Sequence, residues 1–426
     1  MEPDSIALPV APVLATYRCP GEADDISGGV HLSRLSSFYH KCRHCEQRSD
    51  IARLAPTLQK QWEQLLLTPE PLSLFQPNGV RGLYLNQLTR NEATQIAAAF
   101  TATLREVAEI WRARHPTPRG RWLKVVFGHD CRPSSPDLAI AAATTLRQHG
   151  CELIDLGWSV RPQLDMALRE TEADGAFFVT GHGAAVGWNG FDMVGPDGIV
   201  WSQGGVLSLV EQRFHQPCPR PEREAAPAVV YDATADSLAM LRRELHGLRP
   251  LRVAVEASEP TLLSLLSVSQ PDWPGTVAVI REGEAPAEPL LRSRCDVTFR
   301  LGEDARQCFV LDEAGQPVSD KRLLFGLGEL LLDEHPHVDV VLSDDMFDRC
   351  GWTVERCGPG YLVFHRGGPT EEQLVRTMQS LNSSLGLDGQ GRIWLRREGH
   401  LRCDGLLSLA LILRSLSRTD QNASEW

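Results

Sequence analysis

A Cys-X-X-Cys pair near the N-terminus, Cys42-Arg-His-Cys45, is the first group whose residue types and spacing suit chemistry. This spacing lets two thiolates bind one metal ion, and a structural zinc ion takes four ligands in a tetrahedral arrangement. Cys19, with either His40 or His31, would complete the set. We therefore predict a structural zinc site, with three reduced thiols as the alternative. A redox role is less favoured because no thioredoxin-like strand-helix-strand pattern surrounds the pair.

Polar residues also gather in two glycine-containing loops, each of which directly follows a predicted strand. Gly128 to Ser135 contains Asp130 and Arg132, and Gly181 to Gly190 contains His182. Because ligands of α/β sheets bind beyond the carboxyl ends of the strands, we expect these two loops to form the binding site. The alternative interpretation is structural: Asp130 pairs with Arg132 to hold the first loop, and the second loop simply makes a turn.

The elements that must position the first loop begin with a helix after residue 89. Thr89 and Glu92 form a capping box, and apolar residues follow at helical spacing. A strand is predicted from Leu123 to Phe127. Ser135 is predicted as the N-cap of the next helix, with Pro136 at its first position.

The elements around the second loop continue the same alternation. The preceding helix is expected to end at Gly150, which suits the left-handed position after a helix C-cap. A strand over Leu153 to Leu156, a helix from about Pro162 and a strand over Ala176 to Thr180 follow. This order predicts a parallel or mixed sheet with helices on both faces.

The whole chain of 426 residues divides into a head and three α/β blocks. The head covers residues 1–70, and the best-defined block covers 72–215. A proline-rich linker, 216–228, precedes a second block over 230–316 and a third over 318–426. Each block is long enough to bury a core of its own.

Composition limits the partners and the compartment. The formal net charge of −12 disfavours nonspecific nucleic-acid binding, because polyanions attract basic surfaces. The longest apolar run, Leu406 to Leu413, is too short to span a bilayer and predicts a buried helix. The acidic N-terminus lacks the basic start of a secretory signal. We therefore expect a cytoplasmic protein that binds neither nucleic acid nor membrane.

Three stretches of the 72–215 block carry a family resemblance. Phe75-Gln-Pro-Asn-Gly-Val-Arg-Gly82 resembles the motif F-G-T-S/D-G-I-R-G, and Val125-Val-Phe-Gly-His-Asp-Cys-Arg-Pro-Ser-Ser135 resembles V-V-V-G-R-D-T-R-P-S-S. Thr180-Gly-His-Gly-Ala-Ala-Val-Gly-Trp-Asn-Gly-Phe-Asp-Met193 resembles T-A/G-S-H-N-P-x-x-x-N-G-x-K. In this order and spacing the motifs are similar to those of the phosphohexomutase (phosphomannomutase/phosphoglucomutase) family.

The resemblance implies an α/β fold of three successive α/β/α domains with mixed sheets, preceded here by the small Cys/His head. The family's fourth domain, which carries a phosphate-binding loop, has no counterpart in this sequence. Members of the family are intramolecular phosphotransferases of carbohydrate metabolism that use a phosphoserine and Mg²⁺. By resemblance, phosphate binding falls to Arg81, Arg132 and Thr180, and the loop scaffold to Asp130, Asn189 and Gly190.

The sequence departs from the family pattern at the catalytic position. An ungapped alignment of the second loop puts His182 where the family has its serine, and Gly183 where it has histidine. An alignment anchored on histidine instead puts Gly181 at the serine position and requires an insertion, and neither alignment supplies a hydroxyl there. The magnesium loop has also changed. Of its three aspartates Asp304 survives beside Glu303, and Arg306 occupies the third aspartate position. Magnesium is therefore expected for the family but not in this chain, because a cation at that position repels Mg²⁺.

The sugar-reading loop departs as well, because the corresponding stretch, Gly391 to Leu395, lacks the family's glutamate and serine. We therefore predict a catalytically impaired homologue, or pseudoenzyme, that binds a sugar phosphate or regulates a protein partner. The alternative is an active divergent hexose-phosphate mutase in which His182 carries the phosphoryl group, as histidine can. A third interpretation makes His182 a loop residue hydrogen-bonded to backbone.

Overall fold

The computed structural model describes most of the chain, and the described residues are 16–19, 23–67, 73–115, 120–185, 187–281, 295–333 and 336–426. The side chains of His40 and Arg281 lie outside this description. So does the proline-rich stretch 283–289, which interrupts the pattern of the second block in the sequence.

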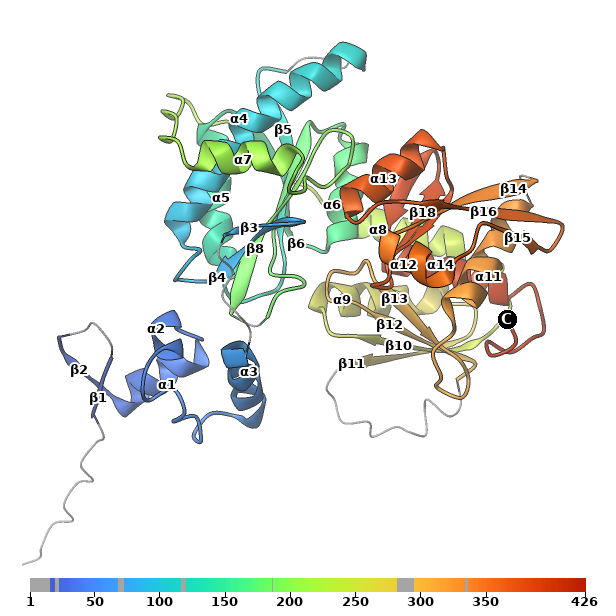
Figure 1. The fold of residues 1–426 in the computed structure, drawn as a ribbon, viewed down its shortest axis with the longest axis horizontal. Helices are drawn as coiled ribbons and strands as arrows, with labels where there is room; N and C mark the ends of the chain where they lie inside the picture. The colour runs from blue at the N-terminus through green and yellow to red at the C-terminus, as the bar shows by residue number, and fades with distance from the viewer. Residues whose placement is uncertain are drawn as a thin grey trace, which may run out of the picture.

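The N-terminal head is a small helical unit with a short hairpin, and it lies below the first large sheet in Figure 1. Its apolar interior combines Leu35, Phe38, Trp62 and Leu65. The indole N–H of Trp62 donates to the carbonyl of Arg48 at 2.8 Å, which satisfies its polar atom inside this core. The elements of the head are β1 (Thr16–Arg18), β2 (Asp25–Ser27), α1 (Gly28–Ser36), α2 (His40–Arg43) and α3 (Pro56–Leu67).

The described residues of the first α/β block form a mixed seven-stranded sheet in the order β3-β4-β8-β7-β5-β6-β9. Strands β7, β5, β6 and β9 run parallel, whereas β3, β4 and β8 pair antiparallel. The strands are β3 (Phe75–Gln76), β4 (Gly79–Leu83), β5 (Leu123–His129), β6 (Cys151–Trp158), β7 (Gly175–Val179), β8 (Trp188–Val194) and β9 (Ala228–Val230). The helices are α4 (Arg90–Arg114), α5 (Ser135–Gln148), α6 (Arg161–Glu170) and α7 (Val206–Phe214).

The local signals of this block are largely confirmed. Helix α4 begins with the predicted capping box, and both of its reciprocal bonds, between Thr89 and Glu92, are present. Gly150 has a φ of 85° directly after the C-cap of α5, as a left-handed C′ glycine should. The predicted N-cap is wrong: Ser134 holds that position and makes no side-chain cap bond. The Ser135 hydroxyl donates instead to Asp130, whose carboxylate competes for it.

The linker is attached to the first α/β block by contacts that its sequence does not indicate. Its last residue, Ala228, begins β9, which pairs in parallel with β6 at the sheet edge. Backbone hydrogen bonds also tie the linker to the end of α5, from Glu222 to Gln148 at 2.7 Å and from Ala226 to Arg147 at 2.9 Å. These bonds are long-range and leave no trace in local composition.

The remaining described residues build two further mixed sheets. The four-stranded sheet has the order β11-β10-β12-β13, with β10 (Arg252–Ala257), β11 (Thr276–Arg281), β12 (Val297–Leu301) and β13 (Cys308–Leu311). The six-stranded sheet has the order β15-β16-β14-β17-β18-β19, with β14 (His337–Leu342), β15 (Val354–Cys357), β16 (Gly360–Arg366), β17 (Leu385–Leu387), β18 (Ile393–Arg397) and β19 (His400–Cys403). The accompanying helices are α8 (Ala233–Leu245), α9 (Pro260–Ser269), η1 (Gln270–Asp272), α11 (Asp320–Leu332), α12 (Asp344–Cys350), α13 (Glu371–Ser380) and α14 (Gly405–Leu416).

One apolar core joins these two sheets, and the predicted buried helix lies within it. Helix α14 contains the apolar run Leu406 to Leu413, all of which is buried. Its neighbours are α8 from the second block and α11 from the third. The prediction of a buried helix is therefore confirmed, and the helix fastens the two blocks together.

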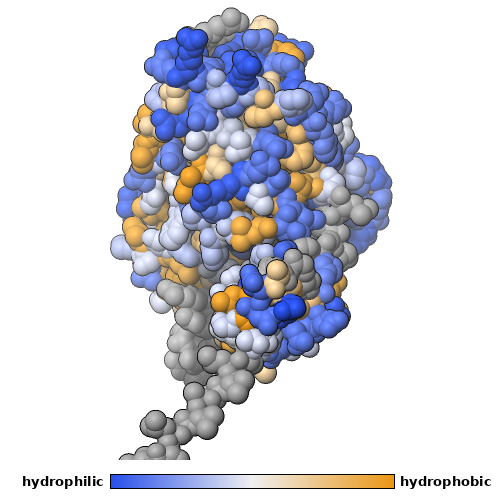
Figure 2. Space-filling model, turned by 90° about the vertical axis from the view of Figure 1, so that its left-hand side faces the viewer, coloured by the Kyte–Doolittle hydropathy of each residue, from blue (hydrophilic) through white to orange (hydrophobic). Residues whose placement is uncertain are grey.

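The surface is mostly polar where it can be seen. On the face in Figure 2, hydrophobic residues are scattered singly among hydrophilic ones, as on an ordinary water-exposed surface. Within the part of the chain that the structure describes, no helix combines the length and the apolar character that crossing a membrane needs.

Candidate functional site

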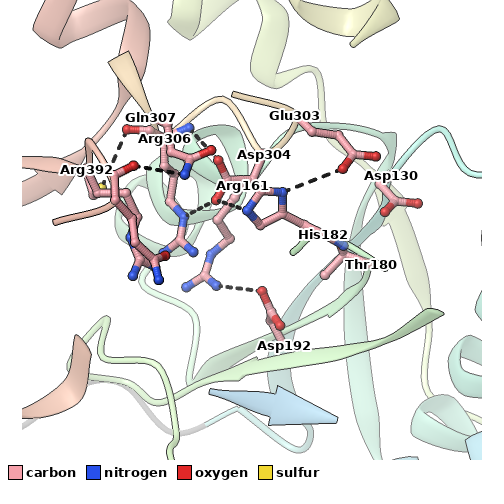
Figure 3. Close-up of polar contacts among 12 residues, drawn as sticks. Asp130, Arg161, Thr180, His182, Asp192, Glu303, Asp304, Arg306, Gln307 and Arg392 are labelled. Atoms are coloured by element: carbon pink, nitrogen blue, oxygen red, sulfur yellow. Dashed lines mark hydrogen bonds and ion pairs between the residues drawn. The ribbon is translucent and has the colours of Figure 1, made fainter. Parts of the chain in front are cut away.

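Three loops meet around His182, and Figure 3 shows their polar side chains turned toward one another. Two of them follow β5 and β7 of the first sheet, as the sequence predicts. The third loop, Gly302 to Gln307, joins β12 to β13 in the second sheet. The residues predicted for the catalytic position and for the degenerate magnesium loop therefore come together.

The carboxylate of Asp130 holds the two loops of the first sheet. It accepts the backbone N–H of Arg132 at 3.1 Å and the backbone N–H of Gly181 at 2.9 Å. It also accepts the Ser135 hydroxyl. A carboxylate with several backbone donors is well compensated even where it is largely buried. Asp130 thus lies where a loop-scaffold residue should.

The guanidinium of Arg132 spans the second loop. Its Nη1 donates to the carbonyl of Trp188 at 2.9 Å, and its Nη2 donates to the carbonyl of Ala184 at 3.1 Å. Nη2 also contacts the carboxylate of Glu303 at 3.2 Å. A Cβ added to Gly181 would lie 2.6 Å from the backbone carbonyl oxygen of Trp188 and would also displace Arg132, so glycine is required beneath this arginine. The donors of Arg132 are largely engaged by the protein itself.

The other predicted loop residues lie beside this arginine. The side-chain amide of Asn189 donates to the Ser134 hydroxyl at 2.7 Å, and its oxygen accepts the N–H of Gly190 at 2.7 Å. A Cβ at Gly190 would meet the Val80 carbonyl oxygen at 1.7 Å, so β4 and β8 can approach only because this residue is glycine. Thr180 is buried, and its hydroxyl accepts the backbone N–H of His182 at 3.0 Å.

The ring of His182 is enclosed by acidic residues of the second block. Its Nε2 lies 3.2 Å from Oδ2 of Asp304, and its Nδ1 lies 3.9 Å from Oε2 of Glu303. Nδ1 is buried and has no hydrogen-bond partner among the described residues. Burial lowers the pKa of His182, and Arg306 lowers it further, although Asp304 opposes both. His182 is therefore a neutral imidazole at pH 7.

Asp304 is the first link of a buried ion network that reaches the third sheet. Nε of Arg306 donates to Asp304 at 2.8 Å, and its Nη1 donates to Glu371 at 2.7 Å. Nη1 of Arg392 donates to the other oxygen of Glu371 at 2.8 Å. Burial alone would raise the pKa of Asp304, but Arg306, His182 and hydrogen bonds from Arg306 lower it to about 2. Asp304 is thus ionised, and its oxygens are already bonded to protein groups.

A second arginine pair lies at the base of the site, and sequence reasoning missed most of it. Nη2 of Arg81 donates to Asp192 at 2.7 Å, and Nη1 of Arg161 lies 3.5 Å from the other oxygen of Asp192. Arg81 also donates to the carbonyl of His182 at 3.1 Å. One signal was available: Asp192 stands where the quoted motif has lysine, and this reversal of charge calls for a basic partner.

The residues of the Mg²⁺ loop do not fit the ion. Mg²⁺ requires several oxygen ligands in near-octahedral geometry. Asp304 is bonded to Arg306 and His182, and Glu303 is paired with Arg132. The guanidinium of Arg306 adds a permanent positive charge in the same loop. We therefore derive no chemistry through a metal at this loop.

The zinc site predicted for the head finds no support in the structure. The described residues hold no group of three or more His, Cys, Asp or Glu side chains arranged to bind a metal ion. The Sγ of Cys19 accepts a bond from Arg34 at 3.0 Å, and the Sγ of Cys45 accepts the backbone N–H of Gln47 at 3.4 Å. The side chain of His40, the fourth predicted ligand, lies outside the described residues.

The head nevertheless contacts the candidate site through its apolar core. Leu83 and Trp188 belong to the same buried cluster as the interior of the head, and Ala184 and Ala185 pack against that cluster. A Cβ at Gly187 would meet the Cβ of Phe38 at 2.9 Å. The loop that carries His182 therefore lies between the head on one side and the second block on the other.

Comparison with known proteins assigns this arrangement to a family. Residues 72–214 match the family model described as phosphoglucomutase/phosphomannomutase, alpha/beta/alpha domain I. The probable phosphoglucosamine mutase of Methanosphaera stadtmanae is 27% identical over 371 residues, which cover 81% of this chain and 76% of that protein. A protein of Xanthomonas campestris pv. campestris (strain B100), named phosphohexose mutases, is 24% identical over 374 residues, which cover 83% of this chain and 79% of that protein.

Solved structures agree on the fold. The phosphoglucomutase/phosphomannomutase family protein of Burkholderia thailandensis superposes with a TM-score of 0.66 at 19% identity, over 84% of this chain and 79% of that one. The phosphoglucomutase parafusin of Paramecium, in its open form, superposes with a TM-score of 0.57 at 11% identity, over 83% of this chain and 73% of that one. The family model over residues 72–214, the relatives and the fold all point to the alpha-D-phosphohexomutase family.

Proposed function

We propose that this protein binds a phosphorylated hexose or hexosamine without isomerising it, and that it serves as a regulatory member of its family. The observation that carries the proposal is the ring of His182 at the serine position. Its Nε2 faces Asp304 and its Nδ1 is buried. A phosphoryl group could reach neither nitrogen without displacing Asp304 or opening the loop.

The network around Arg306 supports the same proposal. Arg306 is 5% exposed and is paired with Asp304 and Glu371, so it compensates charge that a metal would otherwise compensate. Phosphoryl transfer depends on stabilising negative charge that develops on the transferred group. A loop whose carboxylates are already neutralised by fixed guanidinium groups supplies little of that stabilisation.

The proposed ligand class follows from the relatives, which are named as mutases of phosphorylated hexoses and of phosphorylated glucosamine. Arg81 and Arg132 border the loop of His182, but each is bonded to protein acceptors. A ligand phosphate would therefore have to compete with Asp192 and with backbone carbonyls. We expect weak binding that changes the shape of the loop, and the adjoining head would pass that change to a protein partner.

A coupled assay tests the catalytic half of the proposal. Purified protein is incubated with glucose 1-phosphate, mannose 1-phosphate or glucosamine 1-phosphate, together with Mg²⁺ and the matching bisphosphate activator. We expect no turnover above that of the His182→Ala variant. Turnover in the wild type that His182→Ala abolishes would overturn the proposal and make His182 a phosphoryl carrier.

Calorimetric titration with the corresponding 6-phosphates tests the binding half. Binding should weaken in Arg132→Gln and persist in Arg223→Gln, which removes an equal charge from an exposed linker position. A wild type that binds none of these phosphates would contradict a sugar-phosphate-binding role.

A further inference from the structure

A large cavity lies away from His182, between the first and the third α/β blocks. It has a volume of about 710 Å³, which is in the range of metabolite-binding sites. One wall is helix α6 with the residues that follow it. The other wall is α13 and the hairpin of β18 and β19, close to α6 in Figure 1.

Two arginines in this cavity have donors that no group of the described residues satisfies. The side chain of Arg169, at the end of α6, forms no hydrogen bond or ion pair with any described residue, and its Nε is buried. Arg402, on β19, is 9% exposed; its Nη2 donates to Glu398 at 2.9 Å, but its buried Nε has no partner within the described chain. Burial lowers the pKa of Arg169 and the nearby charge of Arg402 lowers it further, although Asp165, Glu170 and Asp404 oppose this lowering.

The remaining basic lining groups add to this positive character. Arg396 donates to the carbonyls of Ser383, Gly399 and Met378 and has no carboxylate partner among the described residues. Burial lowers the pKa of His400, with further lowering by Arg169 and then Arg402. The imidazole of His400 is therefore a neutral hydrogen-bonding group beside two guanidinium groups.

Most acidic residues of the lining are already paired. Asp165 accepts from Arg161 at 3.1 Å, and Asp174 accepts from Arg112 at 2.6 Å. Glu398 is shared between Arg402 and Arg243. Glu170 and Glu172 lie at the rim, where they are accessible to water. Inside the cavity, the unsatisfied groups are therefore donors, and they favour an anion.

We propose that this cavity binds a phosphate-bearing metabolite, whose phosphate group bridges Arg169 and Arg402 and lies beside His400. Guanidinium groups recognise phosphate oxygens through paired, charge-assisted hydrogen bonds. The cavity is much larger than one phosphate, so the rest of the ligand lies against Leu401, Val200 and Val375. No residue of this phosphate site belongs to the loops around His182, although Arg161 and Glu371 border both regions.

Titration of the full chain with pyrophosphate at low salt, followed by calorimetry, tests the proposal. We expect saturable binding that becomes weaker by about tenfold or more in Arg169→Gln and in Arg402→Gln, as the loss of a charge-assisted hydrogen bond predicts. Arg169→Lys keeps the charge and should retain part of the affinity. Arg223→Gln should bind as the wild type does, because it removes an equal charge from an exposed linker position.

Arg132→Gln separates this site from the loops around His182. Affinity that is lost in Arg132→Gln but unchanged in Arg169→Gln and Arg402→Gln would place the anion at those loops and overturn the proposal. Absence of pyrophosphate binding by the wild type would also overturn it. Succinate serves as a second probe, and binding of succinate in place of pyrophosphate would exclude phosphate as the recognised group.

Discussion

Nε2 of His182, in a loop of the first sheet, lies 3.2 Å from Oδ2 of Asp304, in a loop of the second. The contact joins the residue that the resemblance puts at the serine position of the family motif to the aspartate that it puts in the family's metal loop. Asp304 continues through Arg306 and Glu371 to Arg392, so one buried network joins loops associated with all three large sheets. In the folded chain these charges therefore bind one another.

Arg306→Ala should destabilise the protein by about 3–5 kcal/mol, because it leaves Asp304 and Glu371 buried without their shared partner. Urea unfolding followed by circular dichroism measures this change. The control is Arg418→Ala, whose partner Asp333 is half-exposed, and the loss there should be about 0–1 kcal/mol. Equal effects at the two positions would show that the buried network does not stabilise the fold.

Asp304 should make the protein sensitive to acid. Its pKa falls from 3.8 to about 2 on folding, so the carboxylate stabilises the folded state above pH 4. That stabilisation, on the order of 2 kcal/mol, is lost as the pH falls from about 4 toward 2. Unfolding free energies measured across this range should decline less steeply in Asp304→Asn. The exposed Asp420→Asn should follow the wild-type curve, and a similar curve for Asp304→Asn would refute the assignment.

Asp404 should have the opposite effect on how stability depends on pH. It caps α14 by accepting the backbone N–H groups of Leu406 and Leu407. Burial raises its pKa to about 6 despite these bonds. Folding is therefore favoured at low pH, and stability declines as the pH rises from about 4 through 6. Asp404→Asn keeps a good capping residue and should remove this decline, as thermal unfolding at pH 4 and pH 7 would show.

Gly187 and Gly183 offer a matched test of the contact between the head and the His182 loop. Both have positive φ, 89° and 74°, so alanine costs about 1 kcal/mol of backbone strain at either position. A Cβ at Gly187 would also meet Phe38, whereas at Gly183 it would meet nothing within 4 Å. Gly187→Ala should therefore loosen the head. Hydrogen exchange should detect this change as faster exchange of the backbone amides of α1 and α3 than in the wild type.

Gly183→Ala is the control for that measurement, because it changes the loop backbone without touching the head. Equal exchange rates of α1 and α3 in the two variants would mean that the head does not depend on this loop. Exchange confined to α1 and α3, with α4 unaffected, would establish that the head opens as a separate unit.

Several elements could be predicted because their causes lie within a few residues of sequence. The capping box of Thr89 and Glu92, the left-handed Gly150 and the apolar helix over Leu406 to Leu413 each depend on neighbouring side chains and helical periodicity. The family motifs likewise placed His182 at the serine position and Asp304 in the metal loop. Local sequence thus determined the main helices and strands of the first block and its two loops.

Other features depend on groups that meet only when the chain is folded. Ser135 donates to Asp130 in place of capping its helix, and β9 extends the first sheet with residues at the boundary between the predicted linker and the second block. Arg306 reaches Glu371 across 65 residues of sequence. Spacing along the chain does not encode which buried charges will face each other, because that choice follows from how the three sheets pack. The sequence therefore determined the loops and their residue types, and only the tertiary structure decided that these charges neutralise one another.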